Sequence, residues 1–249
     1  MLGLGIIIQA RTGSSRLPNK LILSFYKNDS LIDILLARLK NTFPGLPVIL
    51  ATTTSPSDSV LVEKAKTHGI DYFQGSESNV LQRFIDCGEE KKIHNIIRIC
   101  ADNPFLSMNY LSFLINNLGD FDYVSFKRKD GTPSIKTHYG FWTEFVRLKS
   151  LKKIQKMTVD TLYLEHVTNY IYTHPESFSI QWFPVSEQIE KLPIRLTVDT
   201  MTDFVLAKEI YKSLSDANMA IEPENILPII YNNEKYLSTM QEQIFRNSK

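Results

Sequence analysis

Apolar runs alternate with amphipathic stretches through the first half of the chain. Residues 5–8 are a glycine and three isoleucines, and such a run without polar alternation predicts a strand buried on both faces. The apolar spacing of 30–39 is helical, and Gly69 is a typical stop for a helix over 57–68. We predict strands at 5–8, 47–52, 70–73 and 95–101, and helices at 30–39, 57–68 and from about 76 onwards.

The second half of the chain is less regular. A polar turn at 127–131 and an aromatic strand around 139–145 predict a small antiparallel excursion from the main sheet. Strands that alternate with helices indicate an α/β fold, with a mostly parallel sheet flanked by helices and right-handed crossovers. We further predict a helix over 161–174, a core strand over 194–198, an amphipathic helix over 203–214 and a helical tail over 222–249.

Composition narrows the class of protein. The 249 residues suit one large α/β domain, and a hydrophobic content of 43% excludes wholesale disorder. Lys and Arg number 28 against 27 acidic residues, which argues against nucleic-acid binding. Cys87 and Cys100 have no metal-ligand spacing and fit a reducing compartment. We find no signal peptide and no apolar run of about 20 residues, so we expect a soluble cytoplasmic protein without membrane insertion.

The segment "GIIIQARTGSSRLPNKLIL" gathers cations around a glycine turn. Arg11, Arg16 and Lys20 flank the turn at 12–15, where backbone N–H groups can surround an anion. Charge-assisted bonds to phosphate oxygens would add to this, so we interpret the segment as a polyphosphate site. The alternative is an ordinary turn with solvated charges. The glycine spacing of a P-loop is missing.

Two aspartates follow apolar runs. Asp102 comes after "IIRICA" and Asp199 after "IRLTV", so both lie at predicted strand ends, where parallel sheets bind ligands. Paired carboxylates suit a hard divalent cation such as Mg²⁺. The alternative is that each aspartate caps the following helix. For the pair beside a cationic loop, we favour the metal interpretation.

A second glycine turn precedes a predicted helix in "FQGSESNVLQRF". Its backbone amides, with Ser76 and Asn79, can hydrogen-bond a base or a ribose. The alternative is a turn in which Ser76 or Ser78 caps the helix, and the residues alone favour this alternative. The roles of His138 and His166 are also ambiguous, since a helix histidine flanked by apolar residues is usually a packing residue.

Several segments, taken together, resemble the nucleotide-sugar cytidylyltransferases. The segments resemble especially the spore coat polysaccharide biosynthesis protein SpsF group and, more distantly, the synthetases of CMP-sialic acid and CMP-ketodeoxyoctulosonate. The resemblance implies a GT-A-like Rossmann fold of the nucleotide-diphospho-sugar transferase type that binds CTP and Mg²⁺. The matching segments, in order, are "QARTGSSRLPNKLIL", "LATTTSPSD", "FQGSESNVLQRF", "IIRICADNPFL", "YLEHVTNYIYTHPE" and "RLTVDTMTDF".

The resemblance assigns roles to residues. It implies one domain over 1–249, with a nucleotide-binding half at about 1–120 and an acceptor- or dimer-facing half at about 121–249. Asp102 and Asp199 match the metal-binding aspartates, and Arg11 and Lys20 join them as catalytic residues. The triphosphate and part of the nucleotide would contact Gln9, Ala10, Arg11, Gly13, Ser14, Arg16, Lys20 and Asp102, while Thr52, Gly75, Ser76, Asn79 and Arg83 would meet the base and ribose.

The segment 132–146 departs from the family pattern, and it should face the acceptor. In a strand, alternate residues share a face, so Lys136, His138 and Gly140 would point one way and Tyr139 the other. We hypothesise that Lys136 and His138 contact an anionic acceptor. The alternative is a solvated strand or a subunit contact.

The resulting functional hypothesis is a Mg²⁺-dependent cytidylyltransferase. It would transfer CMP from CTP to a sugar or sugar-like acid for a surface polysaccharide, with release of pyrophosphate and with a homodimer as a possible assembly. The alternatives are a glycosyltransferase that consumes a nucleotide sugar and a nucleotide-binding subunit without turnover.

Overall fold

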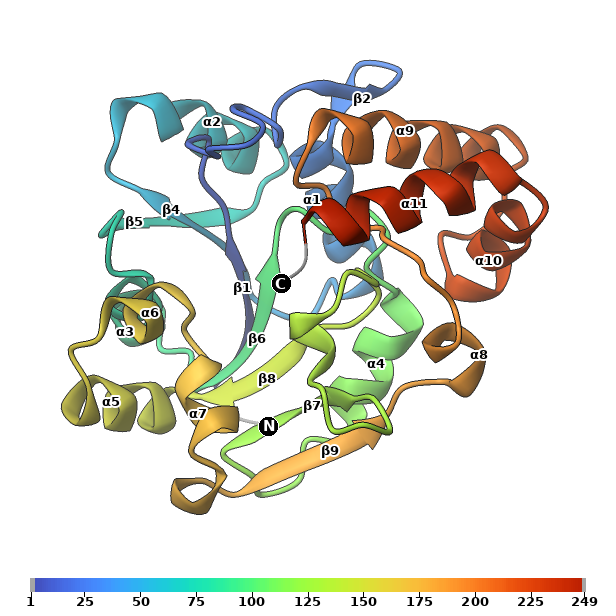
Figure 1. Cartoon of the computed structure of the whole chain (residues 1–249). Coiled ribbons are helices and arrows are strands. Elements are labelled where there is room, and N and C mark those ends of the chain that lie inside the picture. The colour runs from blue at the N-terminus through green and yellow to red at the C-terminus, as the bar shows by residue number, and fades with distance from the viewer. Residues whose placement is uncertain (1–2, 248–249) are drawn as a thin grey trace.

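The computed structural model describes residues 3–247, which form one seven-stranded mixed sheet covered by helices on both faces (Figure 1). The strand order is β5-β4-β1-β6-β8-β7-β9. Only β8 runs against its neighbours β6 and β7, and the other pairs are parallel. The strands are β1 Leu4–Gln9, β4 Val48–Thr53, β5 Asp71–Gly75, β6 Asn95–Cys100, β7 Tyr123–Lys127, β8 Glu144–Arg147 and β9 Ile180–Pro184.

Helices and a small hairpin fill the connections. The hairpin pairs β2 (Ser24–Tyr26) with β3 (Asp29–Ser30), beside α9. Short 3₁₀ turns lie at Pro56–Asp58, Ser134–Lys136 and Pro175–Ser177. The helices are α1 Leu31–Thr42, α2 Ser59–Thr67, α3 Val80–Glu90, α4 Met108–Asn116, α5 Leu148–Met157, α6 Thr161–Glu165, α7 Asn169–Thr173, α8 Glu187–Glu190, α9 Met201–Asp216, α10 Pro223–Tyr231 and α11 Glu234–Arg246.

The central strand β1 separates two hydrophobic cores. Ile6 and Ile8 pack on the face covered by α1, α2, α4 and α9–α11, whereas Ile7 packs on the face covered by α3, α5 and α7. All three isoleucines are fully buried, which confirms the prediction of a strand covered on both faces. Within residues 3–247, no helix combines the length and apolar character needed to cross a membrane.

The predicted alternation of the first half is confirmed, with small shifts of the boundaries. Ser30 caps α1, and Gly69, the predicted stop, follows α2 with a φ of +60°. The predicted antiparallel excursion is present as β8, but the strand expected around 139–145 begins only at Glu144. Gly140 adopts a φ of +74°, and a Cβ there would lie 3.3 Å from the backbone of Leu196, so this close approach interrupts an extended strand.

Two other predictions in the second half need correction. The helix predicted over 161–174 is split into α6 and α7, because Thr168 is buried and its hydroxyl donates to Glu144 at 2.8 Å. The strand predicted over 194–198 is an irregular segment. Its N–H groups bond to loop carbonyls, as when Leu196 donates to His138 (2.8 Å) and Val198 to Asp102 (3.0 Å). The helical tail forms α10 and α11, and its last two residues, 248–249, lie outside the described range.

Candidate active site

The cationic loop after β1 is anchored through Thr12. The buried carboxylate of Asp58 accepts from the Thr12 N–H (2.7 Å) and the Thr12 hydroxyl (2.6 Å). The Thr12 carbonyl in turn accepts from the N–H groups of Ser14 (2.8 Å) and Asn19 (3.0 Å), which folds the loop around this point. The loop therefore has a fixed conformation, set by a residue of the neighbouring β4–α2 connection.

Lys20 joins the two aspartates that the sequence singled out. Its Nζ lies 2.9 Å from Asp102 Oδ2 and 3.6 Å from Asp199 Oδ1, and it also donates to the Val198 carbonyl at 2.6 Å. Burial alone would lower the pKa of Lys20, but the two carboxylates outweigh it and raise the pKa above the ordinary value. Lys20, a cation of the loop, thus contacts both carboxylates that the sequence predicted to lie together.

The two aspartates do not cap helices. The cap of α9 is Thr200, whose hydroxyl accepts from the Asp203 N–H, and the cap of α4 is Ser107. The two helices thus take their caps from Thr200 and Ser107. Asp102 and Asp199 both form ion pairs with Lys20.

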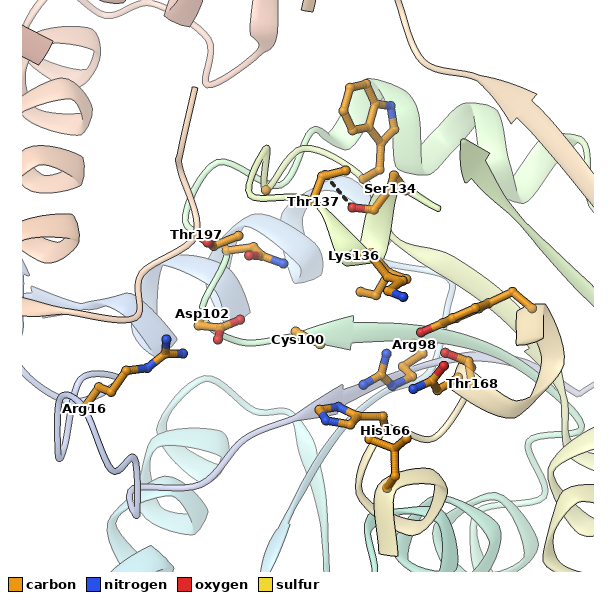
Figure 2. A pocket seen from close by; sticks show the side chains of 17 residues that line it. Arg16, Arg98, Cys100, Asp102, Ser134, Lys136, Thr137, His166, Thr168 and Thr197 are labelled. Carbon is orange, nitrogen blue, oxygen red and sulfur yellow. Dashed lines mark hydrogen bonds between the residues drawn. The ribbon is translucent and has the colours of Figure 1, made fainter. Parts of the chain in front are cut away.

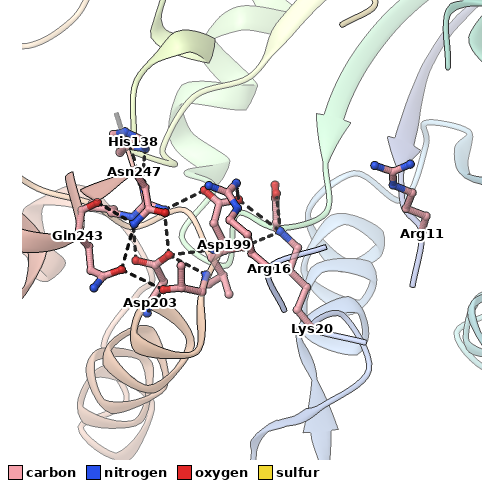
Figure 3. Close-up of polar contacts among 12 residues, drawn as sticks. Arg11, Arg16, Lys20, His138, Asp199, Asp203, Gln243 and Asn247 are labelled. Atoms are coloured by element: carbon pink, nitrogen blue, oxygen red, sulfur yellow. Dashed lines mark hydrogen bonds and ion pairs between the residues drawn. The ribbon is translucent and has the colours of Figure 1, made fainter. Parts of the chain in front are cut away.

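Asp199 belongs to a larger buried network (Figure 3). Arg195 donates to Asp199 Oδ2 at 2.9 Å and holds Asp203 through Nε at 2.7 Å, while Arg16 Nη2 lies 3.1 Å from Asp199 Oδ1. Burial lowers the pKa of Arg195, but Asp203 and Asp199 together raise it above the ordinary value. Arg195 is thus a permanent cation that fixes the position of Asp199.

His138 lies inside this network. Its ring is buried, with Nδ1 2.6 Å from Arg195 Nη1, and it does not line the cavity that Lys136 lines. The strand that would have placed His138 and Lys136 on one face is not formed, since Lys136 ends a 3₁₀ turn. Tyr139 is packed in the core, as predicted.

Arg11 lies apart from the carboxylates in Figure 3. Its guanidinium is 3.7 Å from Glu165 of α6, and its side chain is 41% exposed. A solvated pair of this kind contributes little stability and leaves Arg11 able to exchange partners. Ala10, one residue earlier, is buried in the core, and its N–H donates to the Ala51 carbonyl at 3.2 Å.

The residues predicted at the base and ribose are mostly engaged in local contacts. Thr52 is buried, and its hydroxyl donates to Asp58 at 3.1 Å. Asn79 caps α3 by accepting from Gln82 (2.9 Å), and Ser76 Oγ accepts from the Asn79 N–H (3.0 Å). The turn after Gly75 does lead into a capped helix, but the predicted cap is wrong, since Asn79 caps α3 in place of Ser76 or Ser78.

The Arg83 side chain holds the backbone of the same turn. It is fully buried, and its Nη1 donates to the Ser76 carbonyl at 2.8 Å. Burial lowers its pKa to about 10, with a smaller contribution from the charge of Arg11. Gly75 also needs its small size, since a Cβ there would lie 2.8 Å from the Phe73 ring and 3.1 Å from Arg83. Arg83 thus fixes the backbone of this turn.

A cavity of about 590 Å³ opens beside Asp102 (Figure 2). One wall is the segment from Ser134 to Trp142, and another comes from α6, α7 and the turn between them. Arg16 and Thr197 line it close to Asp102, and Arg98 projects from β6. His166, which the sequence left open, lines this cavity and is exposed.

Sequence reasoning missed the residues under this cavity. Arg98 donates to Glu144 Oε1 at 2.5 Å and to Gln9 Oε1 at 2.9 Å, so it connects the cavity to the start of the cationic loop. Glu144 also accepts from Tyr123 and from Thr168. Burial lowers the pKa of Arg98, but nearby negative groups, Glu144 among them, raise it overall. An arginine inside the apolar run "IIRIC" was the signal available in the sequence.

Comparisons with known proteins confirm the resemblance found in the sequence. The family model for cytidylyltransferases matches residues 5–248. The spore coat polysaccharide biosynthesis protein SpsF of Bacillus subtilis is 33% identical over 84% of this chain and 87% of its own. A solved cytidylyltransferase from Leptospira borgpetersenii is 26% identical over 95% of this chain and 97% of its own, with a TM-score of 0.80. The CMP:2-keto-3-deoxy-manno-octonic acid synthetase, solved with CTP, shares the fold at 13% identity over 84% of this chain and 98% of its own, with a TM-score of 0.60.

Proposed function

Because the chain belongs to the cytidylyltransferase family, we propose that it transfers CMP from CTP to a sugar or sugar-like acid and releases pyrophosphate. The observation that carries this proposal is the meeting of Lys20 with Asp102 and Asp199 at the sheet edge, beside the cavity. Similarity to a spore coat polysaccharide protein supports a role in making a surface polysaccharide.

The proposed reaction is an attack on the α-phosphorus of CTP. An oxygen of the acceptor forms the new phosphorus–oxygen bond, while the bond from the α-phosphorus to the bridging oxygen breaks and pyrophosphate leaves. The protein has little covalent work to do, so it acts by positioning the reactants and by neutralising charge. We assign charge neutralisation on the leaving pyrophosphate to Arg11, Arg16 and Lys20.

Arg11, Arg16 and Lys20 can leave their present partners to bind phosphate. Arg11 pairs with the solvated carboxylate of Glu165, and Lys20 and Arg16 are held by carboxylates at the same edge of the sheet. We propose that Lys20 and Arg16 exchange carboxylate oxygens for phosphate oxygens when CTP binds. The bonds given up and the bonds formed are both charge-assisted, so the cations keep hydrogen bonds of the same kind after the exchange.

The carboxylates fit a Mg²⁺ site. Mg²⁺ is usually held by one or two carboxylates together with substrate phosphates and waters. Asp102 and Asp199 already share one cation, and no group in residues 3–247 donates to Oδ1 of Asp102. No cluster of three or more metal-binding side chains occurs in that range, so phosphate would have to complete the ligand set. When bound, Mg²⁺ supplies positive charge to the phosphate oxygens.

The turn of the loop fits close contact with phosphate. A Cβ at Gly13 would meet only Glu77 Oε1, at 3.9 Å, so no neighbour in residues 3–247 requires a glycine there. We propose that Gly13 serves the nucleotide, with the backbone of Ser14 and the side chain of Gln9 beside it. We propose that the turn at Gly75 and Ser76 contacts the base and ribose through its backbone.

Pyrophosphate release from CTP tests the proposal. The wild-type protein with Mg²⁺ should release pyrophosphate only when an acceptor is present, and Lys20→Met should reduce the rate by about 100-fold or more. The exposed Lys156 of α5 offers a matched control, Lys156→Met, which should retain the full rate. Release of free nucleotide from a nucleotide sugar, with none of pyrophosphate from CTP, would instead support a glycosyltransferase.

A further inference from the structure

Lys20 lies between the two carboxylates that we assign to Mg²⁺. Its Nζ is 2.9 Å from Asp102 Oδ2 and 3.6 Å from Asp199 Oδ1, so one ammonium group contacts both side chains. Ammonium groups and divalent cations seek the same carboxylate oxygens. A divalent cation that bridges these two oxygens would therefore have to take the place of the ammonium group.

Buried contacts hold the ammonium group in this position. Nζ donates to the Val198 carbonyl at 2.6 Å, and the Lys20 side chain is 11% exposed. The loop on either side is anchored in the core through Leu17 and Leu21, which are both buried. Lys20 thus lacks the freedom of an exposed lysine, and it stays beside the carboxylates unless a ligand draws it away.

Two arginines occupy Asp199 as well. Arg195 donates to Oδ2 at 2.9 Å, and Arg16 Nη2 lies 3.1 Å from Oδ1. The Arg195 side chain is fully buried and also holds Asp203, whereas the Arg16 side chain is half exposed. This network balances three positive charges with three negative ones, on Arg16, Lys20, Arg195, Asp102, Asp199 and Asp203.

A divalent cation by itself is disfavoured at this site. Its two positive charges would add to a network that is already neutral, where Asp102 Oδ2 and both oxygens of Asp199 contact a cation. Like charges repel, and screening by salt is weak for buried groups. A triphosphate changes this balance, because it brings several negative charges and accepts charge-assisted hydrogen bonds from Lys20 and Arg16.

We propose that Lys20 is a stand-in for the divalent cation, which keeps the carboxylate pair closed to metal until a nucleoside triphosphate binds. The phosphates then draw Lys20 and Arg16 away, and the ammonium group leaves the carboxylates to the metal. The protein therefore binds the metal together with the nucleotide or after it. This inference rests on the proposed function and deepens it, since Lys20 also controls the order in which nucleotide and metal bind.

Binding of Mn²⁺ to the protein without nucleotide tests the inference. Mn²⁺ is the probe, because the electron paramagnetic resonance signal of the free ion is lost when it binds. Lys20→Met removes the ammonium group and should bind Mn²⁺ at least about tenfold more tightly than wild type, because the carboxylates are no longer shared with a cation. A lysine with a purely structural role would give no such gain.

Further variants separate charge from shape and locate the gained site. Lys20→Arg keeps the positive charge and should bind Mn²⁺ as weakly as wild type. Lys20→Gln loses the charge but keeps a donor for the Val198 carbonyl, so it should gain affinity even where Lys20→Met folds poorly. The gain should disappear in the double variant Lys20→Gln/Asp102→Asn. Lys156→Met, on the exposed face of α5, should behave as wild type.

The order of binding is tested on the wild-type protein. The relaxation rate of water protons rises when a manganese–CTP complex joins a protein. Wild type should raise this rate with Mn²⁺ and CTP together, and not with Mn²⁺ alone. An equal rise without CTP would contradict the closed carboxylate pair.

Equal Mn²⁺ affinity of wild type, Lys20→Met and Lys20→Gln would overturn the inference, as would a gain that persists in the double variant. CTP affinity and pyrophosphate release are measured on the same preparations. If Lys20→Gln gains affinity for Mn²⁺ but wild type neither binds CTP nor releases pyrophosphate, the proposed function fails while the closed carboxylate pair stands. If wild type releases pyrophosphate but neither variant gains affinity, the inference fails alone.

Discussion

Replacing Asp58 by asparagine should destabilise the protein and loosen the cationic loop. The Asp58 carboxylate accepts five hydrogen bonds, two from Thr12 (2.7 and 2.6 Å), one from Thr52 (3.1 Å) and two from Thr53 (3.3 and 2.5 Å). An amide has only one oxygen, so its NH₂ group must face the N–H of either Thr12 or Thr53. One buried N–H then has no acceptor.

The expected loss follows from these contacts. A hydrogen bond to a charged group contributes about 1.5–3 kcal/mol, and a buried donor without a partner costs a similar amount, so we expect a loss of about 3 kcal/mol. For a chain of this size, about 3 kcal/mol lowers Tm by roughly 6–12 °C. CTP should also bind more weakly to Asp58→Asn, because Thr12 no longer holds the loop.

The pH dependence gives a second readout of the same carboxylate. Burial raises the pKa of Asp58, but the hydrogen bonds from Thr12, Thr53 and Thr52 outweigh it and hold the pKa below the ordinary value of 3.8. The ionised group therefore stabilises the fold above that value, and this contribution is lost as the pH falls through the lower folded pKa. The gap between wild type and Asp58→Asn should be constant at roughly pH 5–8 and shrink below about pH 4.

Urea unfolding and thermal melts across this pH range measure the effect, with calorimetry for CTP. Asp71→Asn is the matched control, because Asp71 is exposed and pairs with Lys91 at 3.0 Å. It should change stability by no more than about 0.5 kcal/mol. An Asp58→Asn protein as stable as this control, or a gap that widens in acid, would refute the reasoning.

Three further predictions concern the nucleotide, the carboxylates and the buried histidine. CTP should bind more tightly than CMP in calorimetry with Mg²⁺, and equal affinities would contradict a loop that grips the outer phosphates. Asp102→Asn and Asp199→Asn should each reduce pyrophosphate release by about 100-fold or more, and both should lower Tm, because they remove a partner of buried Lys20 and of buried Arg195. Activity near wild type in both would contradict the paired-carboxylate site. His138→Ala should lower Tm and leave the acceptor KM unchanged, and a raised KM with an unchanged Tm would return His138 to the acceptor site.

The sequence predicts the sheet well where the pattern is local. Ile6, Ile7 and Ile8 are apolar without interruption, and a strand covered on both faces is the arrangement that buries all of them. That Asp102 and Asp199 lie near each other, where both contact Lys20, was also predictable, since each follows an apolar run. The strand predicted over 194–198, just before Asp199, was wrong, because N–H groups of this segment donate to loop carbonyls.

The contacts that decide the rest of the site are distant in sequence. Thr168 interrupts a helical pattern because its hydroxyl meets Glu144, which is 24 residues away. His138 is turned into the protein by Arg195, 57 residues away. Neither partner is visible in a local pattern of apolar and polar residues. An unexpected charge within an apolar run, as with Arg98, was the one available sign of such a network.

The fate of labelled CTP tests the central claim most directly. The protein is incubated with Mg²⁺, a polyhydroxylated carboxylic acid and CTP that carries label on either the α- or the γ-phosphate. Transfer of CMP predicts that the α-label appears in a CMP adduct of the acid and that the γ-label appears in pyrophosphate. An α-label that stays in CTP or appears only in free CMP would contradict the account.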